Sequence, residues 1–236
     1  MTNRPYRSAL YIPGSKPRAL DKARSLPTDA IIFDLEDAVS PGEKAAARST
    51  LAAELYKGGY GERARIVRVN GPDTEWGADD ITAVAEMDCD AILLPKVNGP
   101  EEIEAVAMRL PEIGIWAMME TPRGILNALA ITSHPRLEGI VVGTNDLAKD
   151  LGVRGAVGRG PLITALQTCV LAARAGGVVA LDGVYNAFKD EDGLRAECEQ
   201  GRDFGFDGKT LIHPAQLAIA NAAFAPSEDE IDLARR

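Results

Sequence analysis

Strand-like and helix-like stretches alternate along the whole chain, and this alternation restricts the possible fold more than any other feature of the sequence. Between and after the strand-like runs lie helix-like runs such as residues 43–55, 100–110, 161–175 and 214–224, several with proline at the first helical position. Such alternation predicts a parallel sheet with crossover helices. Eight short apolar runs are typical of buried strands: residues 9–13, 30–36, 65–70, 91–97, 113–120, 139–143, 178–184 and 209–213. Eight such units favour a closed (β/α)8 TIM barrel of the α/β class over an open doubly wound sheet.

The length and composition favour a single domain. With 236 residues and 46% hydrophobic content, the chain can bury one large core. We expect residues 1–225 to form the barrel and residues 226–236 to begin a C-terminal helix, because Ser227 is followed by acidic residues as in a helix N-cap and first turn. That helix has barely begun at Arg236, so we expect a segment to be missing beyond it.

The charge and the cysteines exclude several classes of protein. The net charge of -9 argues against nucleic acid or an anionic membrane surface as the main partner. The N-terminus lacks the apolar region of a signal peptide, and no apolar run reaches the about 18 residues of a membrane span. Three irregularly spaced cysteines, Cys89, Cys169 and Cys198, indicate buried thiols in a reducing cytoplasm. Two histidines leave little for zinc ligation or a Ser-His triad.

Glu120 and Asp146 each follow an apolar strand-like run and stand where the next loop begins. Catalytic groups of parallel barrels come from the carboxyl ends of the strands, so two acids from consecutive strands can converge on one ion. A Glu and an Asp with no histidine nearby suit Mg²⁺, which prefers oxygen ligands and takes only one or two protein carboxylates. The alternative is that both acids are helix caps or solvated loop residues.

An arginine lies within the third apolar strand. Ile66, Arg68 and Asn70 share one face of this strand. A buried arginine is costly unless it is paired, so we expect Arg68 to point into the barrel mouth toward carboxylates. The alternative is a structural ion pair with an acid such as Glu36.

Three acids, Asp34, Glu36 and Asp37, end the second strand-like run. Such crowding disfavours full ionisation unless cations or a metal offset it, so we expect some of them to face Arg68 or a metal-bound water. A structural role for Asp37, capping the turn at residues 40–42, is equally compatible with the sequence.

Several lysines and arginines also stand near predicted strand ends. Arg18 and Lys22 are spaced i, i+4 on a predicted helix after the first strand, and could bind an anion or form a solvated face. Lys96 ends the fourth strand and is the Schiff-base candidate for a metal-free aldolase, with Lys209 a weaker one. Residues 13–17 match neither GxGxxG nor a Walker A sequence, which counts against a nucleotide-binding fold.

Seven short motifs in this order resemble the citrate lyase beta subunit family, and the resemblance covers nearly the whole chain. The family includes malyl-CoA and citramalyl-CoA lyases, the related malyl-CoA thioesterases and citrate-lyase-beta-like proteins. The motifs are residues 7–14 (RSALYIPG), 34–37 (DLED), 67–70 (VRVN), 94–97 (LPKV), 120–124 (ETPRG), 143–147 (GTNDL) and 208–214 (GKTLIHP).

The resemblance implies a Mg²⁺-dependent barrel that acts on a hydroxy-acid thioester. It implies that Glu120 and Asp146 ligate Mg²⁺, with Glu120 also close to the substrate, and that Arg68 binds substrate. By the same resemblance, Tyr11, Arg18 and Lys22 help to hold the substrate or the thioester of CoA or acyl carrier protein. Glu36 and Asp37 are the nearby candidates for the general acid and base. Family members typically form homotrimers or larger oligomers.

Four functions follow as alternatives. The first is a carbon-carbon lyase that cleaves a citryl-, malyl- or citramalyl-type thioester to an acetyl thioester and oxaloacetate, glyoxylate or pyruvate. A thioesterase would use the same metal and substrate but release the free acid and CoA. A metal-free aldolase at Lys96 would survive EDTA. A non-catalytic subunit would bind the oxo-acid or thioester without turnover. Catalytic members of the family generally carry a C-terminal lid with an Asp that reaches a neighbouring subunit, and this sequence ends before that motif. By this resemblance we expect the lid to be truncated or lacking.

Overall fold

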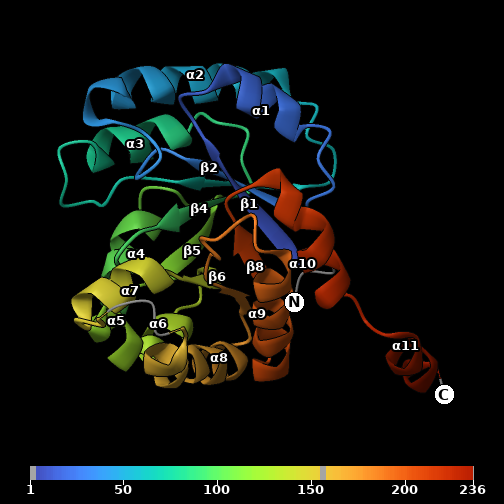
Figure 1. Ribbon diagram of the computed structural model, residues 1–236. Helices are drawn as coiled ribbons and strands as arrows, with labels where there is room; N and C mark the ends of the chain where they lie inside the picture. Colours follow the sequence, from blue (N-terminus) through green and yellow to red (C-terminus); the bar gives the residue numbers. More distant parts are fainter. Residues whose placement is uncertain (1–3, 155–157, 236) are drawn as a thin grey trace.

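Eight parallel strands form a closed barrel in which each strand pairs with its neighbours in the chain and β8 pairs with β1 (Figure 1). The computed structural model describes residues 4–154 and 158–235. The strands are β1 (Ser8–Pro13), β2 (Ala30–Asp34), β3 (Ala64–Arg68), β4 (Ala91–Leu94), β5 (Gly114–Met119), β6 (Leu137–Val142), β7 (Val179–Asp182) and β8 (Gly208–Leu211). The predicted single-domain (β/α)8 barrel is therefore confirmed.

The strands are shorter than the apolar pattern predicted. β2, for example, ends at Asp34 and not at residue 36, and β4 ends at Leu94 and not at residue 97. Apolar residues such as Leu35 and Val97 continue into the loops and stay fully buried in the core. Buried residues therefore extend beyond the hydrogen-bonded ends of the strands, and the apolar pattern alone overestimates strand length.

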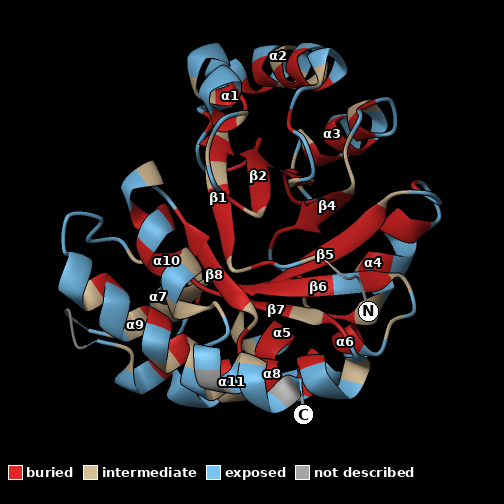
Figure 2. Cartoon of the chain, turned by 90° about the vertical axis from the view of Figure 1, so that its right-hand side faces the viewer, coloured by how far each residue is buried: buried red, intermediate tan, exposed pale blue. Residues whose placement is uncertain are grey.

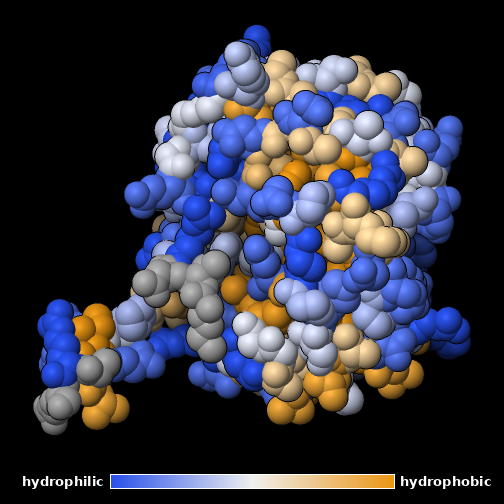
Figure 3. Space-filling view, turned by 180° about the vertical axis from the view of Figure 1, so that it is seen from behind, coloured by the Kyte–Doolittle hydropathy of each residue, from blue (hydrophilic) through white to orange (hydrophobic). Residues whose placement is uncertain are grey.

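Helices surround the barrel, as Figure 1 shows. They are α1 (Pro17–Ala23), α2 (Lys44–Lys57), α3 (Gly77–Val84), α4 (Pro100–Ala107), α5 (Pro122–Leu126), α6 (Ala128–Thr132), α7 (Thr144–Asp150), α8 (Ile163–Gly176), α9 (Glu191–Phe204), α10 (Leu217–Ala223) and α11 (Glu228–Ala234). Ser227 caps α11 by accepting a hydrogen bond from the Glu230 backbone, as the sequence predicted. Helix α11 stands off the body of the molecule (Figures 1 and 3). Leu233 on this helix is exposed.

The strands separate two apolar cores. One core lies between the barrel and the helices, and the other fills the barrel itself, so that the strands are buried on both faces (Figure 2). Side chains alternate along a strand, and the inward-facing ones include Ile32 on β2, Ile66 on β3 and Met118 on β5. The next inward-facing positions are Asp34, Arg68 and Glu120. The interior therefore changes from apolar to charged at the carboxyl ends of these strands.

Two further observations bear on the sequence predictions. Within residues 4–154 and 158–235, no helix has both the length and the apolar character needed to cross a membrane. The three cysteines are free thiols, of which Cys169 and Cys198 are buried and Cys89 is half-buried.

Closure of the barrel between β8 and β1 depends on a glycine. A Cβ at Gly208 would lie 1.9 Å from the Tyr6 carbonyl oxygen and 2.7 Å from that of Arg7. We expect Gly208→Ala to lower the free energy of unfolding by about 1–3 kcal/mol, because the backbone must shift to admit the methyl group. Gly42→Ala, where nothing lies within 4 Å, is the control and should leave stability unchanged in denaturant titrations. Equal stability of the two variants would contradict this account of closure.

Candidate active site

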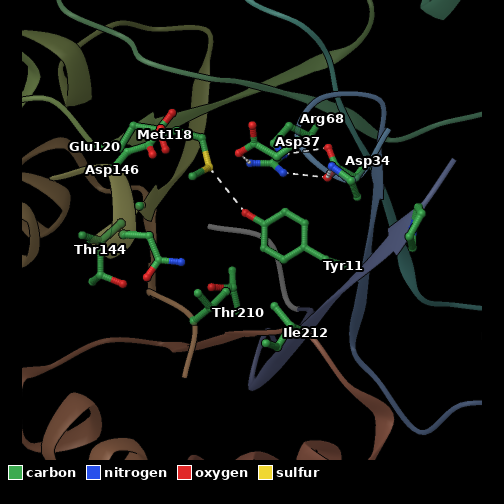
Figure 4. Close-up of a pocket in the computed structure, with 16 residues that line it drawn as sticks. Tyr11, Asp34, Asp37, Arg68, Met118, Glu120, Thr144, Asp146, Thr210 and Ile212 are labelled. Carbon is green, nitrogen blue, oxygen red and sulfur yellow. Dashed lines mark hydrogen bonds and ion pairs between the residues drawn. The ribbon is translucent and has the colours of Figure 1, made fainter. Parts of the chain in front are cut away.

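A cavity of about 350 Å³ opens at the carboxyl end of the barrel (Figure 4). Its lining includes Tyr11 from β1, Asp34 from β2, Arg68 from β3, Glu120 after β5 and Asp146 from α7. Each of these elements is a strand or the loop or helix that follows one, as expected for the catalytic end of a parallel barrel.

The guanidinium of Arg68 is buried and held by carboxylates. Its Nε and Nη2 atoms donate to the two oxygens of Asp34 at 2.8 and 2.6 Å. Its Nη1 atom lies 3.0 Å from Glu36 Oε2 and 3.6 Å from Asp37 Oδ2, and the guanidinium carbon lies 4.9 Å from the centre of the Tyr11 ring. Arg68 therefore points into the mouth toward carboxylates, as predicted, and its closest partner is Asp34.

Asp34 also shapes the loop that follows its strand. Its carboxylate accepts hydrogen bonds from the backbone N–H groups of Glu36 and Ala38 at 2.9 and 3.0 Å. Asp34 thus closes the turn at residues 34–38. The sequence offered Asp37 as the cap of the next turn, at residues 40–42, but the short helix Pro41–Glu43 begins at Ser40 with no side-chain cap from the described residues. The Asp37 side chain is 69% exposed and lines the cavity.

Glu120 is the more buried of the two predicted metal ligands. Its Oε1 atom accepts a hydrogen bond from the Lys96 backbone N–H at 2.8 Å, and its side chain is only slightly exposed. Burial and the nearby Glu36 carboxylate raise the pKa of Glu120 to about 7. A Cβ at residue 143 would lie 2.2 Å from Glu120 Oε2, so Gly143 provides the space that this carboxylate occupies.

The Lys96 ammonium group bridges two carboxylates of the site, Glu36 and Asp146. Its Nζ atom lies 3.2 Å from Glu36 and 3.1 Å from Asp146. Burial lowers its pKa, but the Glu36, Asp146 and Glu120 carboxylates outweigh burial and raise it overall. A protonated ammonium is not a nucleophile, which counts against the Schiff-base hypothesis. Its φ of 53° is rare outside glycine, and this conformation directs the Lys96 N–H to Glu120.

The residues after Glu120 hold the α5 end of the site in place. Thr121 caps α5 by accepting from the Gly124 N–H at 3.0 Å and donates to Asn98 at 2.7 Å. A Cβ at Gly124 would lie 2.3 Å from the Val97 carbonyl oxygen, so only glycine permits this close packing. Pro122 occupies the first turn of the helix. The ETPRG motif thus consists of one carboxylate followed by residues that fix its loop.

The mouth carries more negative than positive charge. Among the described residues, four carboxylates (Asp34, Glu36, Asp37 and Asp146) form ion pairs with Arg68 or Lys96, and a fifth, Glu120, accepts from the Lys96 backbone N–H. A third cation, Lys44, donates to the backbone carbonyls of Leu35 and Glu36 and not to a carboxylate of the mouth. Burial raises the pKa of Glu36, although Arg68 opposes this. The buried Oε2 atom of Glu36 accepts no hydrogen bond from the described residues. An additional cation would offset this excess of charge.

The donors fit Mg²⁺ better than a transition metal. Glu120 and Asp146 lie on the same side of the cavity, opposite Asp34 (Figure 4), and Lys96 contacts both. No group of three or more His, Cys, Asp and Glu side chains with metal-binding geometry occurs in the described part of the chain. Two carboxylates and no histidine suit Mg²⁺, which keeps several water ligands.

Of the remaining predicted residues, one lines the cavity and the others lie outside it. Tyr11 lines the cavity, and burial raises its pKa. Arg18 and Lys22 are exposed on α1 and do not line the cavity. Lys209 is fully buried, where it contacts Asp182 at 3.1 Å and Glu197 at 2.7 Å. The sequence prediction expected some of Asp34, Glu36 and Asp37 to face Arg68 but did not single out Asp34, although the alternation Ala30, Ile32, Asp34 places it on the inner face.

The Asp34–Arg68 pair is expected to stabilise the fold as well as the site. Asp34→Ala leaves a buried guanidinium without its two closest hydrogen-bond acceptors and should lower the free energy of unfolding by about 3 kcal/mol. Asp37→Ala removes an exposed carboxylate that faces the same guanidinium and should lower it by less than about 1 kcal/mol. Denaturant unfolding of both variants measures this difference, and equal losses would show that the buried pair has no special role.

Comparison with known proteins agrees with this geometry. Residues 7–214 match the model of the HpcH/HpaI aldolase/citrate lyase family. The chain is 63% identical to a (3S)-malyl-CoA thioesterase of Cereibacter sphaeroides, covering 98% of this chain and 81% of that protein. It is 34% identical to the citrate lyase subunit beta of Escherichia coli, covering 98% and 80%.

A solved structure is similar over nearly its whole length. The citrate lyase beta subunit of Mycobacterium tuberculosis, complexed with oxaloacetate and magnesium, gives a TM-score of 0.85 at 30% identity and covers 94% of this chain and 98% of that one. The barrel, the acidic mouth and these matches lead to one conclusion: the chain belongs to the HpcH/HpaI aldolase/citrate lyase family, together with the citrate lyase beta subunits and the malyl-CoA thioesterases.

Proposed function

We propose that this chain is a magnesium-dependent thioesterase that hydrolyses a malyl-type CoA thioester to the free hydroxy acid and CoA. The observation that carries the proposal is the acidic mouth, with one buried arginine and two carboxylates suited to Mg²⁺, in a chain 63% identical to a (3S)-malyl-CoA thioesterase. This proposal takes the thioesterase alternative in preference to carbon-carbon cleavage.

Glu120 and Asp146 would hold the metal. Mg²⁺ held there would act as a Lewis acid that polarises substrate oxygens. The magnesium in the M. tuberculosis structure with oxaloacetate supports the choice of metal. In this chain the Lys96 N–H fixes one oxygen of Glu120, and Gly143 leaves room for the other.

Arg68 would bind the negative end of the substrate. Asp34 occupies its Nε and Nη2 atoms, and Nη1 faces Glu36 at 3.0 Å and Asp37 at 3.6 Å. A substrate carboxylate or thioester oxygen would therefore meet Arg68 at Nη1, beside these two acids. Because Asp34 fixes the guanidinium plane, Arg68 would be oriented before substrate arrives. The stacked Tyr11 ring limits its movement on another side.

Of the two candidate acid-base residues, Asp37 is the better placed to act on water. Asp37 lines the cavity, whereas Glu36 lies buried between Arg68 and Lys96. Hydrolysis forms a bond from the water oxygen to the thioester carbonyl carbon and breaks the carbon-sulfur bond. Asp37 would accept the proton of the attacking water, and the proton would then pass to the departing CoA thiolate. Glu36 would position the two cations.

Carbon-carbon cleavage is the second candidate. The similarity to citrate lyase beta subunits favours it, as does the M. tuberculosis structure with oxaloacetate and magnesium. Both reactions need the same metal and the same substrate contacts, so only the products separate them. The homotrimer that the family resemblance implies stays a prediction, which sedimentation can test.

The products of (3S)-malyl-CoA should identify the reaction. With Mg²⁺ present, we expect malate and free CoA in equal amounts, quantified by liquid chromatography and mass spectrometry. Glyoxylate and acetyl-CoA would instead identify a lyase. Mg²⁺-dependent binding without any product from malyl-, citryl- or citramalyl-thioesters would identify a binding subunit and contradict both enzyme proposals.

Removal of either metal ligand should abolish the response to Mg²⁺. Glu120→Gln and Asp146→Asn keep the side-chain shapes but remove the charges, and each should lower kcat by about 10²–10³-fold. In the unaltered chain, Mg²⁺ at a hundred times its Kd should raise the free energy of unfolding by about 2.7 kcal/mol, and both variants should lose this increase. Glu43→Gln, an exposed carboxylate on another loop, is the control. Full activity and normal Mg²⁺ stabilisation in both variants would refute the assignment.

A further inference from the structure

Two aromatic rings are stacked on the outer rim of the site and have no part in the chemistry proposed above. Phe188 lies in the loop after β7, and His213 lies two residues beyond the end of β8. Their ring centres are 4.7 Å apart and their planes are inclined by 26°. Both residues are exposed, and 38% of Phe188 is accessible to solvent. An exposed stacked pair offers a flat apolar face on which another ring can pack.

The stacked pair is joined directly to the cavity. His213 follows Ile212, which lines the cavity. In the other loop, Asn186 donates to Asn145, another lining residue, at 2.7 Å. The loop after β7 thus contacts the start of helix α7, which carries Asp146, and the two rings lie beside the opening of the cavity and not on a remote surface.

The His213 ring is fixed in place. Its Nδ1 atom accepts a hydrogen bond from the Ala215 N–H at 3.2 Å, and Gln216 completes a capping box at this turn. Gln216 also donates to the Tyr185 carbonyl oxygen at 2.9 Å, which ties the two loops together. A ring already held in position loses little conformational freedom on binding.

The proposed substrate requires a second contact region outside the cavity. The acyl group and thioester would occupy the cavity of about 350 Å³, and the nucleotide of CoA cannot fit beside them. The nucleotide must therefore lie on the rim, and its adenine is a flat ring suited to aromatic stacking. Lys189 is exposed next to Phe188, with its Nζ atom 5.9 Å from the centre of that ring, where it can face a phosphate.

We propose that Phe188 and His213 form a stacking platform for the adenine of the CoA thioester, with Lys189 beside its phosphates. This inference rests on the proposed function, because it takes CoA as the carrier. It adds a contact that determines affinity for CoA and distinguishes it from carriers that lack the nucleotide.

Binding of two probes tests the platform without turnover. Calorimetry would measure the Kd of CoA and of 4′-phosphopantetheine, which lacks adenosine, for the unaltered chain and for Phe188→Ala, Phe188→Trp and His213→Asn. Asn can still cap the turn at residue 213 but has no ring. Leu171→Ala, an exposed apolar position on α8, is the control for fold and surface.

We expect Phe188→Ala and His213→Asn to weaken CoA binding about tenfold and to leave 4′-phosphopantetheine binding unchanged. Phe188→Trp and Leu171→Ala should bind both probes as the unaltered chain does. Equal CoA affinity of Phe188→Ala and the unaltered chain, or equal weakening for both probes, would contradict the stacking platform but leave the proposed thioesterase function standing. Failure of the unaltered chain to bind CoA at all would overturn the proposed CoA thioesterase, and with it the platform.

Discussion

The excess of carboxylates at the mouth of the barrel is the constraint on which the site depends. Asp34 and Arg68 form a bidentate pair that is nearly sealed from solvent, and Lys96 joins Glu36 to Asp146. Even with these cations, burial and the Glu36 carboxylate raise the pKa of Glu120 to about 7. An additional positive charge beside Glu120 would stabilise its ionised form. The proposed substrate is also acidic, and an acidic protein that binds it would need such a cation at the point of contact. The magnesium ion that we propose on Glu120 and Asp146 would supply that charge.

The fold delivers these groups through simple strand geometry. Side chains on one face of a strand recur every second residue. The inward-facing side chains Ile32, Ile66 and Met118 fill the barrel. Two residues further along the chain in each case, the inward-facing side chains are Asp34, Arg68 and Glu120, which line the cavity. Parallel strands end at the same side of the sheet, and barrel closure brings these side chains around one cavity. Glycines at tight contacts, such as Gly143 against Glu120, leave the space that the charged side chains occupy.

The sequence was sufficient to predict the eight strands, the closed barrel and the position of Arg68 toward carboxylates, because each follows from local periodicity. It did not identify Asp34 as the closest partner of Arg68, since the apolar pattern extends the strand to residue 36 and gives Asp34 and Glu36 the same face. The chain leaves the ladder after Asp34, whose own carboxylate forms the next turn. The left-handed backbone of Lys96 and the contact between Phe188 and His213 depend on packing between separate loops, which no local pattern encodes. Arg18 and Lys22 share a helix face, but the sequence could not show that this face is exposed away from the cavity.

The most direct test of the central claim is to locate the ion itself. A crystal of the chain grown with Mn²⁺ in place of Mg²⁺ would reveal the metal by its anomalous scattering. The account predicts one ion at the mouth of the barrel, bound by a carboxylate oxygen from each of Glu120 and Asp146, with water completing its ligands. No ion at saturating Mn²⁺, or an ion bound only by Asp37 and its neighbours, would contradict it.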